Sequence, residues 1–170
     1  MGTRGRSWAL VALVGTRGIV DPLALFGYPR RRTGHVALGM LSVLYAHVVF
    51  VTRDRLPLID ATVAECLSDY LVRVAGQEGV HLLALGMVTT HVHLVIRYRP
   101  TVSIPWVLQR LKGGSAHVVS RRVLRPLRWA KGYSIHSVGP RGVPAAVAYV
   151  LSQPERHPDQ RIPDWPRATG

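Results

Sequence analysis

The stretch from Val80 to Tyr98, VHLLALGMVTTHVHLVIRY, decides the fold. It holds two apolar runs, 80–88 and 91–98, and only Thr89 and Thr90 separate them. Two short runs rich in β-branched and aliphatic residues, joined by a short polar turn, predict a pair of antiparallel strands. We therefore expect a hairpin here, around which the remaining elements can be placed.

Upstream of the hairpin, the pattern predicts one strand and one helix. Residues 42–52, SVLYAHVVFVT, are β-branched and aromatic and end at a charged turn, which predicts a strand. Residues 60–78 carry apolar side chains at helical spacing, and Asp60 or Thr62 is available as the N-cap. A strand followed by a helix thus precedes the hairpin.

Downstream, the sequence predicts a helix, a strand and a further helix. Residues 103–124 have helical spacing, which Gly113 and Gly114 could kink, and 132–138 predict a fourth strand. A proline suits the first turn of a last helix over 144–153. The order β-α-β-β-α-β predicts an α+β, ferredoxin-like antiparallel sheet with an additional C-terminal helix that carries a tyrosine.

Residues 1–39 differ from the rest of the chain. They hold three consecutive arginines, glycines and prolines without a sustained helical or strand period. They are either a flexible basic arm or lie upstream of a natural start at Met40, and we favour the second interpretation. We expect an N-terminal extension over 1–39, a catalytic domain over 40–157 and a short tail over 158–170.

The charge is strongly basic, with 22 Lys and Arg against 9 Asp and Glu, a net charge of +13. No acidic residue occurs between Gly79 and Pro154, a stretch that holds ten Lys and Arg. Such a balance favours a polyanionic partner, with nucleic acid first. The missing carboxylates also exclude, for this stretch, the oxygen-rich sites of two-metal nucleases.

Other features indicate a protein of the cytoplasm. Cys66 is the only cysteine, so neither a disulfide framework nor a thiolate zinc site is expected. The apolar run from Trp8 to Gly15 is short, Arg17 follows it, and no run reaches the length of a membrane span. We expect no membrane association and, because no nucleotide-binding loop is found, no nucleotide cofactor.

The first chemical signal is the pair His91 and His93. Side chains alternate along a strand, so both imidazoles point to one face and can bind one divalent ion. Two ordinary half-buried histidines would produce the same pattern, and the signal alone is weak.

The second signal is Tyr149, with Gln153 one helical turn away on the same face. A tyrosine hydroxyl can attack a phosphodiester, but it is a poor nucleophile unless a metal ion polarises the phosphate. Gln153 would complete a two-nitrogen, one-oxygen ligand set that suits Mg²⁺ or Mn²⁺, with imidazole favouring Mn²⁺. A tyrosine on an amphipathic helix is otherwise most often a core residue.

Several ordered motifs resemble the single-tyrosine transposases of the HUH superfamily, named for two histidines flanking a hydrophobic residue. The resemblance runs from about Leu44 to His157. It is carried by YAHVVFVTRDRLPLI (45–59), GMVTTHVHLVI (86–96), LQRLKGGSA (108–116), WAKGYSIHSVG (129–139) and YVLSQPERH (149–157).

The resemblance implies a DNA transposase that cleaves and rejoins single-stranded DNA through a 5′-phosphotyrosine. In this pattern Tyr149 is the nucleophile, and His91, His93 and Gln153 are the metal ligands. It also implies recognition of hairpins near the ends of the element. A homodimer is implied as well, in which the tyrosine helix of one subunit can complete the site of the other.

Two departures from the family pattern stand out. The turn before the histidine pair is Met87-Val88-Thr89-Thr90, whereas relatives often have Met-Pro-Asp or Met-Pro-Asn, so we expect a looser metal site. After His157 the chain shows no clear helix, which is consistent with a shortened copy.

Further residues are candidates for contacts to DNA. We expect phosphate contacts from Arg97, Arg110, Lys112, Arg121, Arg122 and Lys131. Trp106 and Trp129 could stack on bases, although packing is the commoner explanation of a tryptophan. Tyr45, Tyr133, His47 and His136 are interpreted as structural, with His136 also a candidate for contact with DNA.

Two rivals remain open from the sequence. One is a related nickase, either a replication initiator or a host-adopted transposase on palindromic DNA, which would share the catalytic residues. The other is a non-catalytic nucleic-acid-binding module on a ferredoxin-like sheet, which would not need the histidine pair, the tyrosine and the glutamine to coincide.

Overall fold

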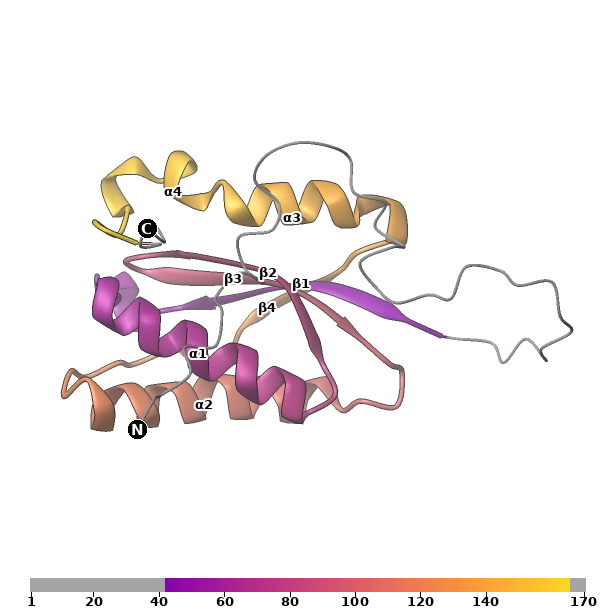
Figure 1. Ribbon diagram of the computed structural model, residues 1–170, viewed down its shortest axis with the longest axis horizontal. Helices are drawn as coiled ribbons and strands as arrows, with labels where there is room; N and C mark the ends of the chain where they lie inside the picture. Colours follow the sequence, from indigo (N-terminus) through magenta and orange to yellow (C-terminus); the bar gives the residue numbers. More distant parts are fainter. Residues whose placement is uncertain (1–41, 166–170) are drawn as a thin grey trace, which may run out of the picture. The chain divides into compact units, whose positions relative to one another are not determined.

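A computed structural model describes residues 42–165, and the expected extension over 1–39 lies outside them. The strands are β1 (Leu44–Val51), β2 (His81–Val88), β3 (His91–Tyr98) and β4 (Ser134–Ser137). They form one sheet in the order β2-β3-β1-β4 with every neighbouring pair antiparallel (Figure 1). Together with the β-α-β-β-α-β order along the chain, this sheet confirms the predicted ferredoxin-like arrangement.

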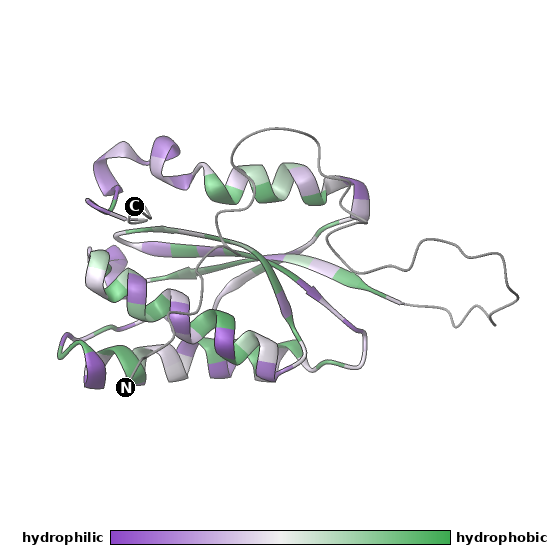
Figure 2. Cartoon of the chain, in the orientation of Figure 1, coloured by the Kyte–Doolittle hydropathy of each residue, from purple (hydrophilic) through white to green (hydrophobic). Residues whose placement is uncertain are grey.

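Two long helices, α1 (Ala61–Gln77) and α2 (Ile104–Arg122), cover one face of the sheet (Figure 1). Alternate strand residues point into this layer, among them Val48 and Phe50 of β1 and Leu94 of β3, all fully buried. Figure 2 shows hydrophobic and hydrophilic residues alternating along both helices, as expected for helices with one apolar side. This layer is the main hydrophobic core.

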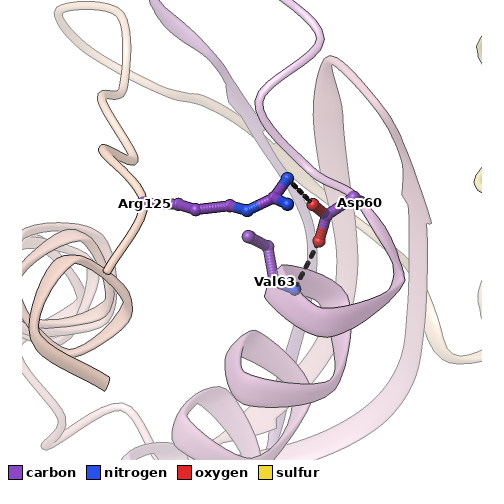
Figure 3. A network of polar contacts seen from close by, with 3 residues as sticks. All are labelled: Asp60, Val63 and Arg125. Carbon is purple, nitrogen blue, oxygen red and sulfur yellow. Dashed lines mark hydrogen bonds and ion pairs between the residues drawn. The ribbon is translucent and has the colours of Figure 1, made fainter. Parts of the chain in front are cut away.

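The helix α1 begins at Asp60, which is its N-cap (Figure 3). One carboxylate oxygen accepts a hydrogen bond from the backbone N–H of Val63 at 2.9 Å. The other oxygen accepts from Arg125, in the segment that follows α2. Of the two candidate caps, Asp60 is therefore the one used, and it ties the start of α1 to the end of α2.

The helix α2 continues through Gly113 and Gly114, so the expected kink is absent. Gly114 instead allows α1 and α2 to approach closely, because a Cβ atom there would lie 1.7 Å from the Tyr70 hydroxyl oxygen. That hydroxyl donates a hydrogen bond to the carbonyl of Arg110 at 3.1 Å. The glycine makes room for the side chain that joins the two helices.

On the opposite face of the sheet lie α3 (Val143–Leu151) and α4 (Gln153–Arg156) (Figure 1). We expected one helix over 144–153, but it ends at Leu151 and Gln153 opens the next helix. Proline at 154 explains the break, because it has no N–H for the carbonyl of Val150 and its ring would clash with that carbonyl in a continuous helix.

Short 3₁₀ turns complete the described chain: η2 (Arg53–Arg55), η3 (Pro140–Gly142) and η4 (Pro158–Gln160). Within the tail expected over 158–170, Ile162 is only 1% exposed and thus packs into the fold. In the described range, 42–165, no helix has the length and apolar character needed to cross a membrane.

Candidate active site

The two histidines of β3 lie on the face of the sheet that α3 covers. His91 and His93 alternate with core residues, and Val95, next on their side, packs against Val150 of α3. Both histidines are 6% exposed, and their ring centroids lie 4.9 Å apart. The expected pair of imidazoles on one face is therefore present, beneath the helix that carries Tyr149.

A close approach of α3 to the sheet brings the tyrosine to this pair. Gly86 of β2 is the register partner of His93, and a Cβ atom on Gly86 would lie 2.0 Å from the carbonyl oxygen of Val150. Only a residue without a side chain lets the helix backbone rest here. The ring of Tyr149 lies 5.8 Å from that of His93, centroid to centroid.

His47 of β1 belongs to the same site, although the sequence suggested a structural role. Its Nε2 lies 2.8 Å from Nδ1 of His93, and the two rings stack at 5.0 Å. The Tyr149 ring also lies 5.7 Å from that of His47, centroid to centroid. His136 of β4 is the register partner of His47, so it also faces this region.

Between the sheet and α3 opens a groove of about 560 Å³. Its polar lining comes from three histidines, an arginine, a serine and the tyrosine, and it includes no carboxylate: His47, His93, His136, Arg55, Ser134 and Tyr149. Tyr149 is 37% exposed, and the Arg156 guanidinium lies 4.7 Å from its ring centroid. The groove thus combines an accessible tyrosine with positive charge and imidazole side chains.

Gln153 is fully buried, with 0% exposure. Its amide nitrogen donates to the carbonyl of Tyr149 at 3.1 Å, while its amide oxygen Oε1 has no hydrogen-bond partner. Buried polar atoms almost always have a partner, so an unpartnered oxygen on a side chain that neighbours His91 fits a ligand position. The tyrosine and the glutamine remain one turn apart although they belong to different helices.

No group of three or more His, Cys, Asp or Glu side chains within 42–165 is arranged to hold a metal ion. A metal bound by His91 and His93 would therefore need its third protein ligand from another residue type. The amide oxygen of Gln153 is chemically suited to this role.

Burial keeps the clustered histidines neutral. It lowers the pKa of His93 to about 3, and the neighbouring His91, His47 and His157 act in the same direction. Burial also lowers the pKa of His91, helped by His157 and opposed by the adjacent Gln153 amide. Neutral imidazoles have a free nitrogen lone pair, which is the form that binds metals.

The turn between β2 and β3, whose sequence led us to expect a looser metal site, is held by several hydrogen bonds. The carbonyl of Thr90 accepts from the backbone N–H of Thr52 at 2.8 Å, and the Thr52 hydroxyl lies within hydrogen-bonding distance of the carbonyls of both Leu56 and Thr90. The Thr89 N–H donates to the carbonyl of Gln160 at 2.8 Å. These bonds fix the residue that immediately precedes His91, without a proline.

The basic residues expected to contact DNA lie on both sides of the sheet. Arg97 lies on β3, in step with His91 and His93 along the strand, whereas α2 and its basic residues cover the other face (Figure 1). Arg110 pairs with Glu78 at 2.7 Å, and the Lys112 ammonium donates to the carbonyls of Ala130 and Gly132.

Arg121, Arg122 and Lys131 are exposed, and together with Arg97 they remain predicted phosphate contacts. A phosphate contact by Arg110 or Lys112 would compete with the partners that these residues already have. Of the two tryptophans, Trp106 is exposed, whereas Trp129 packs against Phe50 and donates to Ser115.

The family model for IS200-like transposases matches residues 40–153 of the 170. The chain belongs to this family. The match includes the histidine pair and Tyr149 and ends at Gln153, and it confirms at family level the resemblance drawn from the motifs.

One relative of similar sequence is also a transposase. The ISDra2 transposase TnpA of Deinococcus radiodurans is 31% identical over 78 residues, which cover 46% of this chain and 56% of that protein. The chain thus matches little more than half of that relative's length.

Solved structures show the same fold. A protein assigned as a transposase from Deinococcus radiodurans is 25% identical, with a TM-score of 0.55 over 78% of this chain and 99% of that one. A REP-associated tyrosine transposase bound to a REP hairpin is 14% identical, with a TM-score of 0.55 over 76% and 74% of the two chains. At that identity, the second likeness concerns the fold alone.

Proposed function

We propose that this chain is a transposase that cleaves and rejoins single-stranded DNA through a 5′-phosphotyrosine on Tyr149. The observation that carries the proposal is a convergence in space. Tyr149 and His93 line one groove, His91 lies beside His93, and the buried Gln153, whose amide oxygen is unpartnered, neighbours His91. A non-catalytic binding module would have no need for this convergence.

A divalent ion, Mn²⁺ or Mg²⁺, would be held by His91, His93 and Gln153. Two neutral imidazoles and an amide oxygen are chemically compatible ligands for such an ion, and imidazole favours Mn²⁺. The ion would supply Lewis-acid polarisation of the scissile phosphate. Gln153 Oε1 is the only buried side-chain N or O atom of residues 42–165 without a hydrogen-bond partner, which supports this ligand set.

The side chains of the groove would act on the tyrosine and the phosphate. The Tyr149 oxygen forms a bond to phosphorus while the bond to the 3′ oxygen breaks, and the proton lost by the tyrosine balances the one gained by the 3′ hydroxyl. The Arg156 guanidinium places positive charge beside the forming phosphotyrosine. Because the new ester conserves the bond, a 3′ hydroxyl can reverse the step without an energy cofactor.

The proposed substrate is single-stranded DNA with hairpin ends. Ten basic and no acidic residues between 79 and 154 support a nucleic-acid partner, and one relative of the same fold is bound to a REP hairpin. The exposed Arg121, Arg122 and Lys131 are the first candidates for backbone contacts away from the groove.

The resemblance also implies a homodimer with shared sites. In the described chain Tyr149 lies beside its own His93, so one subunit already contains every group named above. Mixing Tyr149→Phe with His93→Ala separates the two arrangements. Recovery of cleavage in the mixture supports a tyrosine that serves the partner's histidines, and no recovery supports sites within one subunit.

The central test is a covalent adduct. Wild-type protein with labelled hairpin DNA and Mn²⁺ should give a species that survives denaturation, and Tyr149→Phe should give none. Tyr133→Phe is the matched control, because Tyr133 is also exposed but is absent from the groove lining. An adduct with Tyr149→Phe, or none with wild type, overturns the mechanism; binding without any adduct supports the non-catalytic module.

A further inference from the structure

Hydrogen bonds connect three side chains, those of Gln160, Thr90 and His91, and so link the C-terminal segment to a proposed metal ligand. The Thr90 hydroxyl oxygen lies 2.9 Å from Nδ1 of His91 and 2.5 Å from Oε1 of Gln160. Thr90 is 6% exposed, and Gln160 lies in η4, seven residues beyond the last residue that the family model matches. The family match therefore does not include Gln160, the first of these three residues.

The chemistry of the donors and acceptors determines which atom donates in each of these hydrogen bonds. The Gln160 amide oxygen can only accept, so the single hydroxyl hydrogen of Thr90 points toward it. A lone pair of the Thr90 oxygen then faces His91, and the 2.9 Å contact is a hydrogen bond when Nδ1 carries the proton. A neutral imidazole has one ring N–H, so Nε2 of His91 is left with its lone pair.

Thr90 cannot easily turn away from this arrangement. Its carbonyl accepts a hydrogen bond from the Thr52 N–H, and the neighbouring Thr89 N–H donates to the backbone carbonyl of Gln160. The C-terminal segment therefore holds the turn through its backbone and orients the hydroxyl through its side chain. Ile162, two residues later, is buried and anchors the segment to the fold.

We infer that Thr90 and Gln160 are positioning residues, which hold His91 in the Nδ1-protonated tautomer and present its Nε2 to the metal. The inference rests on the proposed function, since it assigns a purpose to the free nitrogen of a proposed ligand. Partners of this kind fix the orientation of a ligating histidine, and their loss typically weakens metal binding. A residue that follows the family match, Gln160, thus takes part in the site.

The tautomer itself is measured in metal-free protein. Long-range ¹H–¹⁵N spectra of the histidine rings, with His91 assigned from the His91→Gln variant, should show a proton on Nδ1 in wild type. Thr90→Val and Gln160→Leu should shift the His91 signals toward the other tautomer, and Thr90→Ser should restore them. A wild-type proton on Nε2, or no change in Thr90→Val, overturns the inference.

Metal affinity provides the second measurement, by calorimetric titration of DNA-free protein with Mn²⁺. Thr90→Val and Gln160→Leu should each weaken binding by roughly 10- to 100-fold. Thr90→Ser should bind Mn²⁺ as tightly as wild type does. Thr89→Val should do so too, because the Thr89 side chain is in the same turn but makes none of these three-residue contacts. Urea unfolding of every variant at a pH above 7 shows that the comparison is made between folded proteins.

The two proposals fail in different ways. If wild type binds Mn²⁺ and Thr90→Val binds it equally tightly, the positioning role is wrong while the metal site stands. If wild type binds no Mn²⁺, the proposed metal site is wrong and the positioning role falls with it.

Discussion

Asp60 shows how one side chain can stabilise two parts of the fold. Its first oxygen satisfies a backbone N–H at the start of α1, and its second meets Arg125 after α2. The two contributions differ in kind. The cap fills an otherwise unsatisfied donor, whereas the ion pair is largely exposed, with 65% of the Arg125 side chain accessible.

Replacing Asp60 by Ala should therefore lower the free energy of unfolding by about 1 kcal/mol or slightly more, mainly through loss of the cap. Asp60→Asn keeps a capping oxygen and removes the charge, so it should cost less than about 1 kcal/mol, as should Arg125→Ala. Urea denaturation followed by circular dichroism measures all three. If Asn is as harmful as Ala, the ion pair and not the cap is the main contribution.

Single residues also show where sequence reasoning reached its limit. His91 and His93 form one local signal and Tyr149 and Gln153 form another, and the structure places Tyr149 beside His93. His47 carries no such signal, because its contact with His93 depends on the register of two strands that lie 46 residues apart. The link from Gln160 to Thr90 spans 70 residues and was equally hidden.

At the scale of elements, strand and helix positions followed from local periodicity. The core residues of β1, β3, α1 and α2 repeat at spacings of two or about 3.6, which short sequence windows contain. The break at Ser152 was not predicted, because the helical pattern continues to Gln153. The proline at 154 was expected to end the helix directly before it, whereas α3 already ends at Leu151.

The packing of α3 on β2 leads to a prediction for Gly86. Gly86→Ala places a methyl group where the Val150 carbonyl lies, so α3 must move away from the sheet. We expect a loss of about 1–3 kcal/mol in unfolding free energy and a strong decrease in adduct formation, because Tyr149 moves with the helix.

Gly76→Ala is the matched control for that substitution. Gly76 lies in α1, and a methyl group added there would meet no atom within 4 Å. Because alanine also favours helix, stability should stay equal or rise by up to about 1 kcal/mol. Wild-type adduct yield in Gly86→Ala would show that α3 tolerates displacement and would contradict the argument.

For the whole molecule, the buried histidines couple stability to pH. The pKa values of His47, His91 and His93 are lowered in the folded state, that of His93 to about 3. Below about pH 6.5 the unfolded chain binds protons that the folded chain does not bind. Stability is therefore complete above that pH and decreases as the pH falls toward 3.

We predict that the unfolding free energy of the metal-free protein falls by up to about 2 kcal/mol between pH 6.5 and 5 through His93 alone, at 1.36 kcal/mol per pH unit. Urea titrations across this range measure the slope. His93→Gln should flatten it, and His117→Gln, at an exposed position of α2, should leave it unchanged. An unaltered slope in His93→Gln would assign the pH dependence to other groups.

The segment after α4 limits how far the C-terminus of this chain can be truncated. The family match stops at Gln153, yet Ile162 is buried and Gln160 holds the turn before His91. A truncation at the last matched residue would uncover the apolar surface that Ile162 protects and leave the Thr90 hydroxyl without its acceptor. The smallest fragment that retains these contacts therefore extends at least through Ile162.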